Sequence, residues 1–197
     1  MNAKRIRQMV GCWLLTAASA TCGQTHPNVL VIITDQQQAG MLGCAGNPYV
    51  KTPNLDRLAQ TGARFERAYC GNLVCVPSRF CMLSGTLPSV IGMETNGQID
   101  NPVPQSILDS ALGSVFARAG YRTVYGGKTH VPGAKKPNRV ADYGLETICS
   151  NDREELSGAG AAFLREKHDK PFLLVASFIN PHDRAKSKSR RMRRCKE

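Results

Sequence analysis

The chain has 197 residues, of which 42% are hydrophobic and 21% are charged, so a buried core is expected and wholesale disorder is not. No stretch reaches the roughly 18 uncharged apolar residues that a spanning helix needs, which argues against an integral membrane protein. The net charge of +11 comes mostly from the two ends, because residues 184–197 carry +7, residues 1–7 carry +3 and residues 8–183 carry only +1. The middle therefore lacks the charge of a nucleic-acid-binding domain.

The first 20 residues have the pattern of an export signal. Basic residues precede an apolar run at 9–20, which ends in the small-residue triplet 18–20. A short amphipathic or buried helix is the alternative. A lipid anchor at Cys22 ranks second, because the residues before it lack the Leu and the small Gly or Ala of a lipoprotein box. We expect a signal peptide at 1–20 and a periplasmic or secreted protein in an oxidising compartment.

The predicted elements alternate between strands and helices along the chain. The run at 28–34 is apolar and rich in β-branched residues, which predicts a central parallel strand buried on both faces. Further along the chain, helical spacing or helix start and stop signals predict three helices, and two more apolar runs predict strands. In chain order we expect a helix at 52–62, a helix at 105–119, a strand at 121–125, a helix at 150–167 and a strand at 172–178. This alternation predicts an α/β fold, with helices on both sides of a mostly parallel sheet.

Polar side chains follow three of the predicted strands at the point where each one ends. Asp35 and Gln36 come after the first strand, Lys128 and His130 after the strand at 121–125, and His182 after the last strand. Any one of these could be a solvated loop residue. Ligands of parallel sheets bind at the carboxyl ends of the strands, so the whole set indicates a functional site at one rim.

The most specific segment is Cys75-Val-Pro-Ser-Arg79, followed by Leu83-Ser84-Gly85. It resembles the signature of the formylglycine-dependent sulfatases of the alkaline phosphatase superfamily. Four other stretches resemble further blocks of that family in the right order, namely Asp35-Gln36, Thr52–Asp56, Gly127–His130 and Phe178–His182. The resemblance covers residues 27–183 and implies the N-terminal part of a sulfatase catalytic domain.

The resemblance implies that Cys75 is oxidised to formylglycine by a dedicated maturation enzyme. One hydroxyl of the hydrated aldehyde would attack sulfur, and the second would expel sulfate afterwards. Arg79 would brace this nucleophile, and Lys128 would bind sulfate oxygens. His130 would take the diol proton and His182 would bind sulfate or assist the leaving oxygen, although the sequence leaves open which imidazole performs which step.

A divalent metal is also implied. Asp35 and Gln36, with the modified residue 75, would be oxygen ligands of Ca²⁺ or Mg²⁺, which fits a hard cation and not zinc. The expected substrate is a sulfated small molecule or a sulfated glycan. Phosphodiesterases and phosphonate monoester hydrolases of the same superfamily share the cysteine signature, so a phosphoryl ester is the alternative substrate.

Two features leave other interpretations open. Cys70, Cys75 and Cys81 could form disulfides in an exported chain, whereas their spacing does not match zinc–thiolate patterns.

After Asp183 the family pattern stops and the basic tail 184–197 begins. Since members of the family are longer, we expect a truncated, weakly active or inactive copy whose tail comes from a shifted reading frame. A non-catalytic fragment that binds polyanions through this tail is the other possibility.

Overall fold

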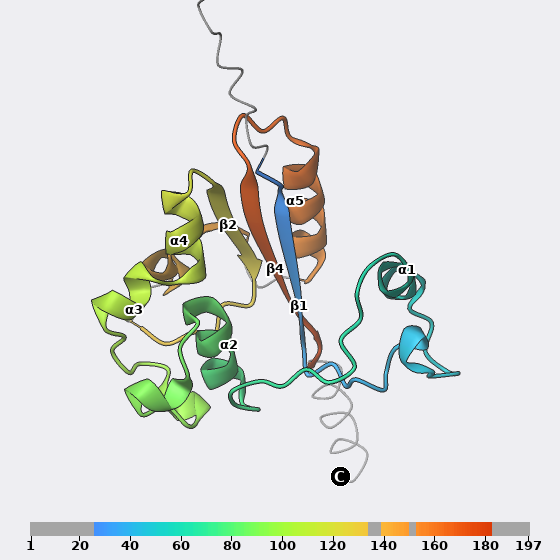
Figure 1. The fold of residues 1–197 in the computed structure, drawn as a ribbon, viewed down its shortest axis with the longest axis horizontal. Coiled ribbons are helices and arrows are strands. Elements are labelled where there is room, and N and C mark those ends of the chain that lie inside the picture. Colours follow the sequence, from blue (N-terminus) through green and yellow to red (C-terminus); the bar gives the residue numbers. More distant parts are fainter. Residues whose placement is uncertain (1–25, 134–138, 150–152, 183–197) are drawn as a thin grey trace, which may run out of the picture.

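The computed structural model describes residues 26–133, 139–149 and 153–182 (Figure 1). The expected signal peptide at 1–20 and the basic tail at 184–197 lie outside the described residues, so both stay predictions. Within the described ranges, no helix combines the length and the apolar character needed to cross a membrane.

The described strands form one four-stranded sheet in the order β1-β4-β2-β3, and all neighbouring pairs are parallel. This confirms the predicted mostly parallel α/β sheet. Two of the strands are longer than the sequence pattern indicated. The bounds are Val29–Asp35 for β1, Arg122–Gly127 for β2, Glu146–Cys149 for β3 and Phe172–Pro181 for β4. The strand β3 was not predicted, since three of its four residues lie in the stretch 126–148, which the sequence pattern indicates as loop.

Helices cover both faces of this sheet. The α-helices are α1 (Pro53–Thr61), α2 (Cys75–Ser84), α3 (Gln105–Asp109), α4 (Leu112–Arg118) and α5 (Arg153–Arg165). Short 3-10 helices occupy the connections at η1 (Gly43–Ala45), η2 (Pro88–Ile91), η3 (Asn96–Gln98) and η4 (Arg139–Tyr143). In Figure 1, α5 lies on one side of the strands and α2 to α4 lie on the other.

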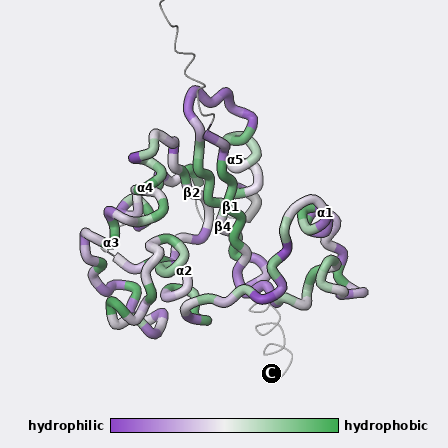
Figure 2. Tube along the Cα trace, viewed as in Figure 1, coloured by the Kyte–Doolittle hydropathy of each residue, from purple (hydrophilic) through white to green (hydrophobic). Residues whose placement is uncertain are grey.

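Alternate residues of the central strand β4 fill two separate cores. Leu173 and Val175 pack with the α2 side chains Val76 and Phe80, whereas Leu174 packs with Phe163 of α5. Figure 2 shows that the strands are mostly hydrophobic, whereas the loop that leads into β4 is hydrophilic. Period-two alternation therefore buries both faces of β4.

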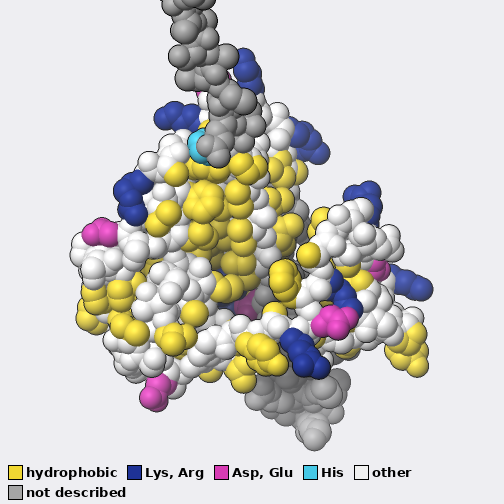
Figure 3. All heavy atoms as spheres, viewed as in Figure 1, with side chains coloured by type: hydrophobic (Ala, Val, Ile, Leu, Met, Phe, Trp, Pro, Cys, Tyr) yellow, Lys and Arg dark blue, Asp and Glu magenta, His cyan; other side chains and the backbone are white. Residues whose placement is uncertain are grey.

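The prediction of β1 as a central strand was wrong for the described part of the chain. β1 forms the edge of the sheet, and its side chains alternate in exposure, with Leu30 43% and Ile32 51% exposed. Figure 3 shows hydrophobic atoms gathered over this strand. Since an apolar run reports only hydrophobicity, it could not reveal that the side chains on one face of β1 are exposed.

The prediction of one helix at 105–119 was also wrong, because the segment forms two helices, α3 and α4. Ala111 between them has the extended values φ −63° and ψ 153°. The Ser110 hydroxyl donates to the carbonyl oxygens of Ser106 and Ile107, and the Ser114 hydroxyl donates to that of Leu108. Such local side-chain bonds offer the backbone an alternative to continued helix.

Candidate functional site

The carboxyl ends of β1, β4 and β2 meet the N-terminal end of α2, and the ionisable side chains gather at this junction. Asp35 ends β1 and is 7% exposed, and Lys128, directly after β2, is also 7% exposed. Arg79 reaches the junction from α2 and is 3% exposed. The sheet order β1-β4-β2 therefore brings together residues from distant parts of the sequence.

Asp35 is the negative centre of this cluster. Its Oδ2 accepts a hydrogen bond from Nζ of Lys128 and lies 3.9 Å from Nη2 of Arg79. Its Oδ1 lies 4.0 Å from Sγ of Cys75. Two buried cations thus face one buried carboxylate, so this group of three charged side chains has a net charge of +1. A site with that balance favours an anion.

The start of α2 offers fewer free amides than an ordinary helix N-terminus. Cys75 is its first residue. The N–H of Val76 donates to Oδ1 of Asn96 at 2.9 Å, that of Ser78 donates to the Val74 carbonyl at 2.9 Å, and Pro77 has no N–H. The helix dipole still favours an anion at this end, but Lys128 and Arg79 are better placed to supply the hydrogen bonds.

Two residues that the sequence did not single out complete the cluster. The hydroxyls of Tyr125 and Ser177, both 0% exposed, donate to the carbonyl oxygen of Lys128. Nη1 of Arg79 donates to Oγ of Ser177 at 2.6 Å and to the same Lys128 carbonyl at 2.9 Å. Burial raises the pKa of Tyr125, so its phenol stays protonated and can donate. Both residues lie inside apolar strands, where the sequence gives no sign of a polar role.

Gly127 allows this close approach of β2 to β4. Its φ is +90°, and a Cβ at this position would lie 2.2 Å from the carbonyl oxygen of Ser177. The next residue donates its N–H to that same oxygen at 2.9 Å. Only glycine therefore fits between the end of β2 and the neighbouring strand.

Both candidate histidines lie at the same rim. His130 is half-buried with φ +42°, and its Nδ1 is buried without a hydrogen-bond partner within the described structure. Burial lowers the pKa of His130 below 6.5, and the nearby Lys128 and Arg79 lower it further. His182 directly follows the carboxyl end of β4, and its charge acts in the same direction on the pKa of His130.

The oxygen donors near Cys75 are of the type that a hard divalent cation prefers, but they are too few to fill its coordination shell. Asp35 contributes carboxylate oxygens next to Cys75, while Gln36, which follows β1 with φ +59°, is exposed. Within the described ranges, no group of three or more His, Cys, Asp or Glu side chains could hold a metal. The Asp35 carboxylate also pairs with Lys128 and Arg79. The described residues therefore supply part of a hard-cation site.

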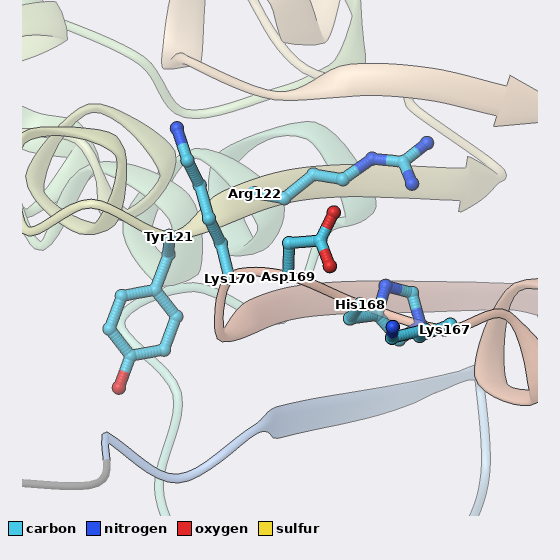
Figure 4. Close-up of a pocket in the computed structure, with 6 residues that line it drawn as sticks. All are labelled: Tyr121, Arg122, Lys167, His168, Asp169 and Lys170. Carbon is cyan, nitrogen blue, oxygen red and sulfur yellow. The ribbon is translucent and has the colours of Figure 1, made fainter.

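Two surface hollows lie at opposite ends of the sheet. An open groove of about 960 Å³ adjoins the cluster and includes Gln36, Leu73 and Pro181 in its lining. The hollow in Figure 4, of about 420 Å³, is lined by residues 121–122, at the start of β2, and by residues 167–170, just before β4. The second hollow is therefore at the amino ends of the strands, away from the cluster.

The described cysteines do not support the disulfide alternative. Cys70, Cys75 and Cys81 are free thiols in the structure, as are Cys44 and Cys149. The position of Cys75 beside Asp35 leaves its modification as the interpretation to test.

A sequence model of the family described as Sulfatase matches residues 27–193. The chain is 32% identical over 188 residues to an ulvan-active sulfatase of Formosa agariphila. The aligned region covers 80% of this chain and 36% of that protein. The chain thus spans little more than a third of the length of this curated relative.

The solved structures agree with the family match. A crystal structure described as a putative sulfatase from Bacteroides thetaiotaomicron has a TM-score of 0.67 and 27% identity, over 80% of this chain and 36% of that one. A phosphonate monoester hydrolase of Agrobacterium radiobacter has a TM-score of 0.63 at 22% identity, over 80% and 41% of the two chains. The second comparison shows a shared fold alone.

Proposed function

Because the chain belongs to the sulfatase family, we propose that the cluster around Cys75 is the sulfate-binding and reacting centre of a sulfuric ester hydrolase. The observation that carries this proposal is the placement of Cys75 against Asp35, within the group formed by Arg79 and Lys128. The surplus of positive charge in that group suits a sulfate ester, which is itself an anion and releases the sulfate anion on hydrolysis.

The nucleophile in this proposal is residue 75 after oxidation of its thiol to formylglycine by a maturation enzyme. A hydrated formyl group supplies one hydroxyl for attack and a second hydroxyl whose deprotonation drives release of the product. The chain positions this residue at the first turn of α2, where the buried neighbours Val76 and Phe80 anchor the helix in the core.

Lys128 and Arg79 would bind and orient the sulfate group. Both side chains are buried, and a cation is worth more to an anion in a water-poor site than on the surface. Asp35 keeps the two cations close together by offsetting part of their repulsion. The bound sulfate would then lie next to residue 75, ready for displacement at sulfur.

His130 would act as the base. Its lowered pKa keeps the imidazole neutral near pH 7, and a neutral imidazole can accept a proton. Nδ1 of His130 is the atom available for this task, since it makes no hydrogen bond within the described structure. His182, at the end of β4, would bind sulfate or assist the leaving oxygen.

Asp35 and Gln36 would hold Ca²⁺ or Mg²⁺, which would add positive charge beside the sulfate oxygens. Calcium usually takes about six to eight oxygens, so these two side chains leave most of the shell to other donors.

The substrate class in this proposal is a sulfated small molecule or glycan. The support is the family match together with the relative described as an ulvan-active sulfatase. A periplasmic or secreted location, proposed from the export-signal pattern at 1–20, would give access to such glycans.

The test is coexpression of the full chain with a formylglycine-generating enzyme, followed by mass spectrometry of the peptide that contains Cys75. We expect conversion of the thiol to an aldehyde in the wild type and no conversion of the control Cys81, which lies in the same helix. A peptide that stays wholly unmodified beside an active maturation enzyme would contradict the proposal.

A phosphoryl ester is the second candidate substrate. The fold shared with the phosphonate monoester hydrolase is compatible with it, and a site with surplus positive charge accepts either anion. Turnover of an aryl sulfate and an aryl phosphodiester, measured side by side on the matured chain, separates the two candidates.

A further inference from the structure

The backbone of Lys128 is fixed at both of its polar groups. Its carbonyl oxygen accepts from Nη1 of Arg79 at 2.9 Å, from Oγ of Ser177 at 2.8 Å and from the Tyr125 hydroxyl. Its N–H donates to the Ser177 carbonyl at 2.9 Å. A carbonyl oxygen has two lone pairs, so three donors on one oxygen are a dense arrangement for a residue directly after a strand.

The two hydroxyls do more than fill the core. Each one accepts from Nη1 of Arg79, at 2.6 Å for Ser177 and 3.3 Å for Tyr125, and donates to the carbonyl of Lys128. Both side chains are 0% exposed, and burying a hydroxyl is costly unless it is bonded. A group that donates and accepts at once is needed here, and an apolar side chain of similar size cannot replace it.

We propose that Tyr125 and Ser177 are positioning residues that lock Lys128 and Arg79 in the orientation in which they receive sulfate. This inference rests on the proposed function, because that function gives the two cations their ligand. The hydroxyls link the guanidinium of Arg79 to the main chain of Lys128, so the guanidinium and the backbone that carries the Lys128 side chain cannot shift independently without breaking these bonds. Asp35 then holds the Lys128 ammonium through its Oδ2 and lies 3.9 Å from Nη2 of Arg79, so both cations face the same carboxylate.

A purely structural role makes a different prediction. If the hydroxyls only join β2 to β4, their loss should weaken folding without changing the behaviour of the Lys128 ammonium. The chain offers matched controls, since the Thr123 hydroxyl donates to the Gly144 carbonyl at 2.6 Å and the Tyr143 hydroxyl donates to the Pro132 carbonyl at 3.0 Å. Both control side chains are buried, and both lose one bond to a backbone carbonyl when the hydroxyl is removed.

The first measurement compares Ser177→Ala and Tyr125→Phe with Thr123→Val and Tyr143→Phe in the full chain. Each protein is treated with an amine-reactive acylating reagent, and mass spectrometry follows the modification rate of Lys128. We expect acylation about fivefold faster in the first pair, the factor for one lost hydrogen bond of typical strength, and unchanged rates in the controls. Ser177→Thr, which keeps the hydroxyl, should restore slow labelling. Equal rates in all four variants would overturn the inference.

The second measurement is the affinity for inorganic sulfate by calorimetry. We expect about fivefold weaker binding for Ser177→Ala and Tyr125→Phe, unchanged binding for the two controls and the largest loss for Lys128→Ala. If Lys128→Ala binds sulfate as well as the wild type, the proposed function fails, and the labelling rates still decide the positioning role. If only Lys128→Ala loses affinity, the positioning role is wrong.

Discussion

Lys128 and Asp35 form a buried ion pair between the ends of β2 and β1, two strands separated in the sheet by β4. Their side chains are 9% and 8% exposed, so neither charge can rely on water. Arg79 approaches the same carboxylate at 3.9 Å. The three groups therefore depend on one another, and removal of the single anion leaves two cations without their partner.

This dependence predicts that Asp35→Ala destabilises the chain by about 3–5 kcal/mol, as expected when a buried pair is broken. Lys128→Ala should cost less, because Arg79 remains beside the carboxylate. The comparison is the free energy of unfolding in urea. Glu66→Ala is the control, because it removes the exposed Arg64–Glu66 pair and should change stability by less than about 1 kcal/mol. A loss for Lys128→Ala that exceeds the loss for Asp35→Ala would contradict this order.

Gly127→Ala should prevent native packing at the end of β2. The new Cβ would meet the Ser177 carbonyl oxygen at 2.2 Å, and φ is +90°, so we expect a loss above about 2 kcal/mol. Gly158→Ala in α5 is the matched control, because a Cβ there meets nothing within 4 Å. That change should stabilise the chain by about 0.5–1 kcal/mol, the helix cost of glycine relative to alanine. Thermal unfolding of both variants measures the two effects.

The lowered pKa of His130 predicts a loss of stability in mild acid. Folding holds this imidazole neutral, whereas the unfolded chain binds a proton at the ordinary value of 6.5. The unfolded state therefore takes up more protons as the pH falls below 6.5, and the folded state loses stability until the pH reaches the folded pKa. Urea unfolding at several pH values should show a shallower fall for His130→Gln than for the wild type. An equal or steeper fall in the variant would show that other groups cause the acid sensitivity.

The exposed edge of β1 predicts self-association. An apolar edge strand with open hydrogen-bonding groups is a template for pairing with another chain. Ile32→Lys, at a position 51% exposed, should reduce the apparent mass in light scattering without unfolding the protein. Ile33→Lys is the contrasting variant, since Ile33 packs against the main core and its substitution should cause unfolding. Unchanged association in a folded Ile32→Lys protein would place the contact elsewhere.

The sequence by itself determined the strand and helix pattern and the chemical groups at the strand ends. An apolar run rich in β-branched residues predicted β1, and a second apolar run predicted β4. The Thr-Pro start and Gly stop at 52–62 predicted α1. Asp35 and Lys128 could be placed at one rim because parallel strands share the direction of their carboxyl ends. These inferences succeed because they depend on local spacing and on one general rule of parallel sheets.

Only the tertiary structure decided which groups meet. Arg79 and Ser177 are 98 positions apart, and no local pattern could reveal that a serine within an apolar strand bonds a guanidinium. The break at Ala111 between α3 and α4 has the same origin, since serine side chains compete for the backbone there while the hydrophobic spacing continues. The edge position of β1 depends on which strands pair with it, and pairing is decided by contacts between distant segments rather than by the hydrophobicity of one.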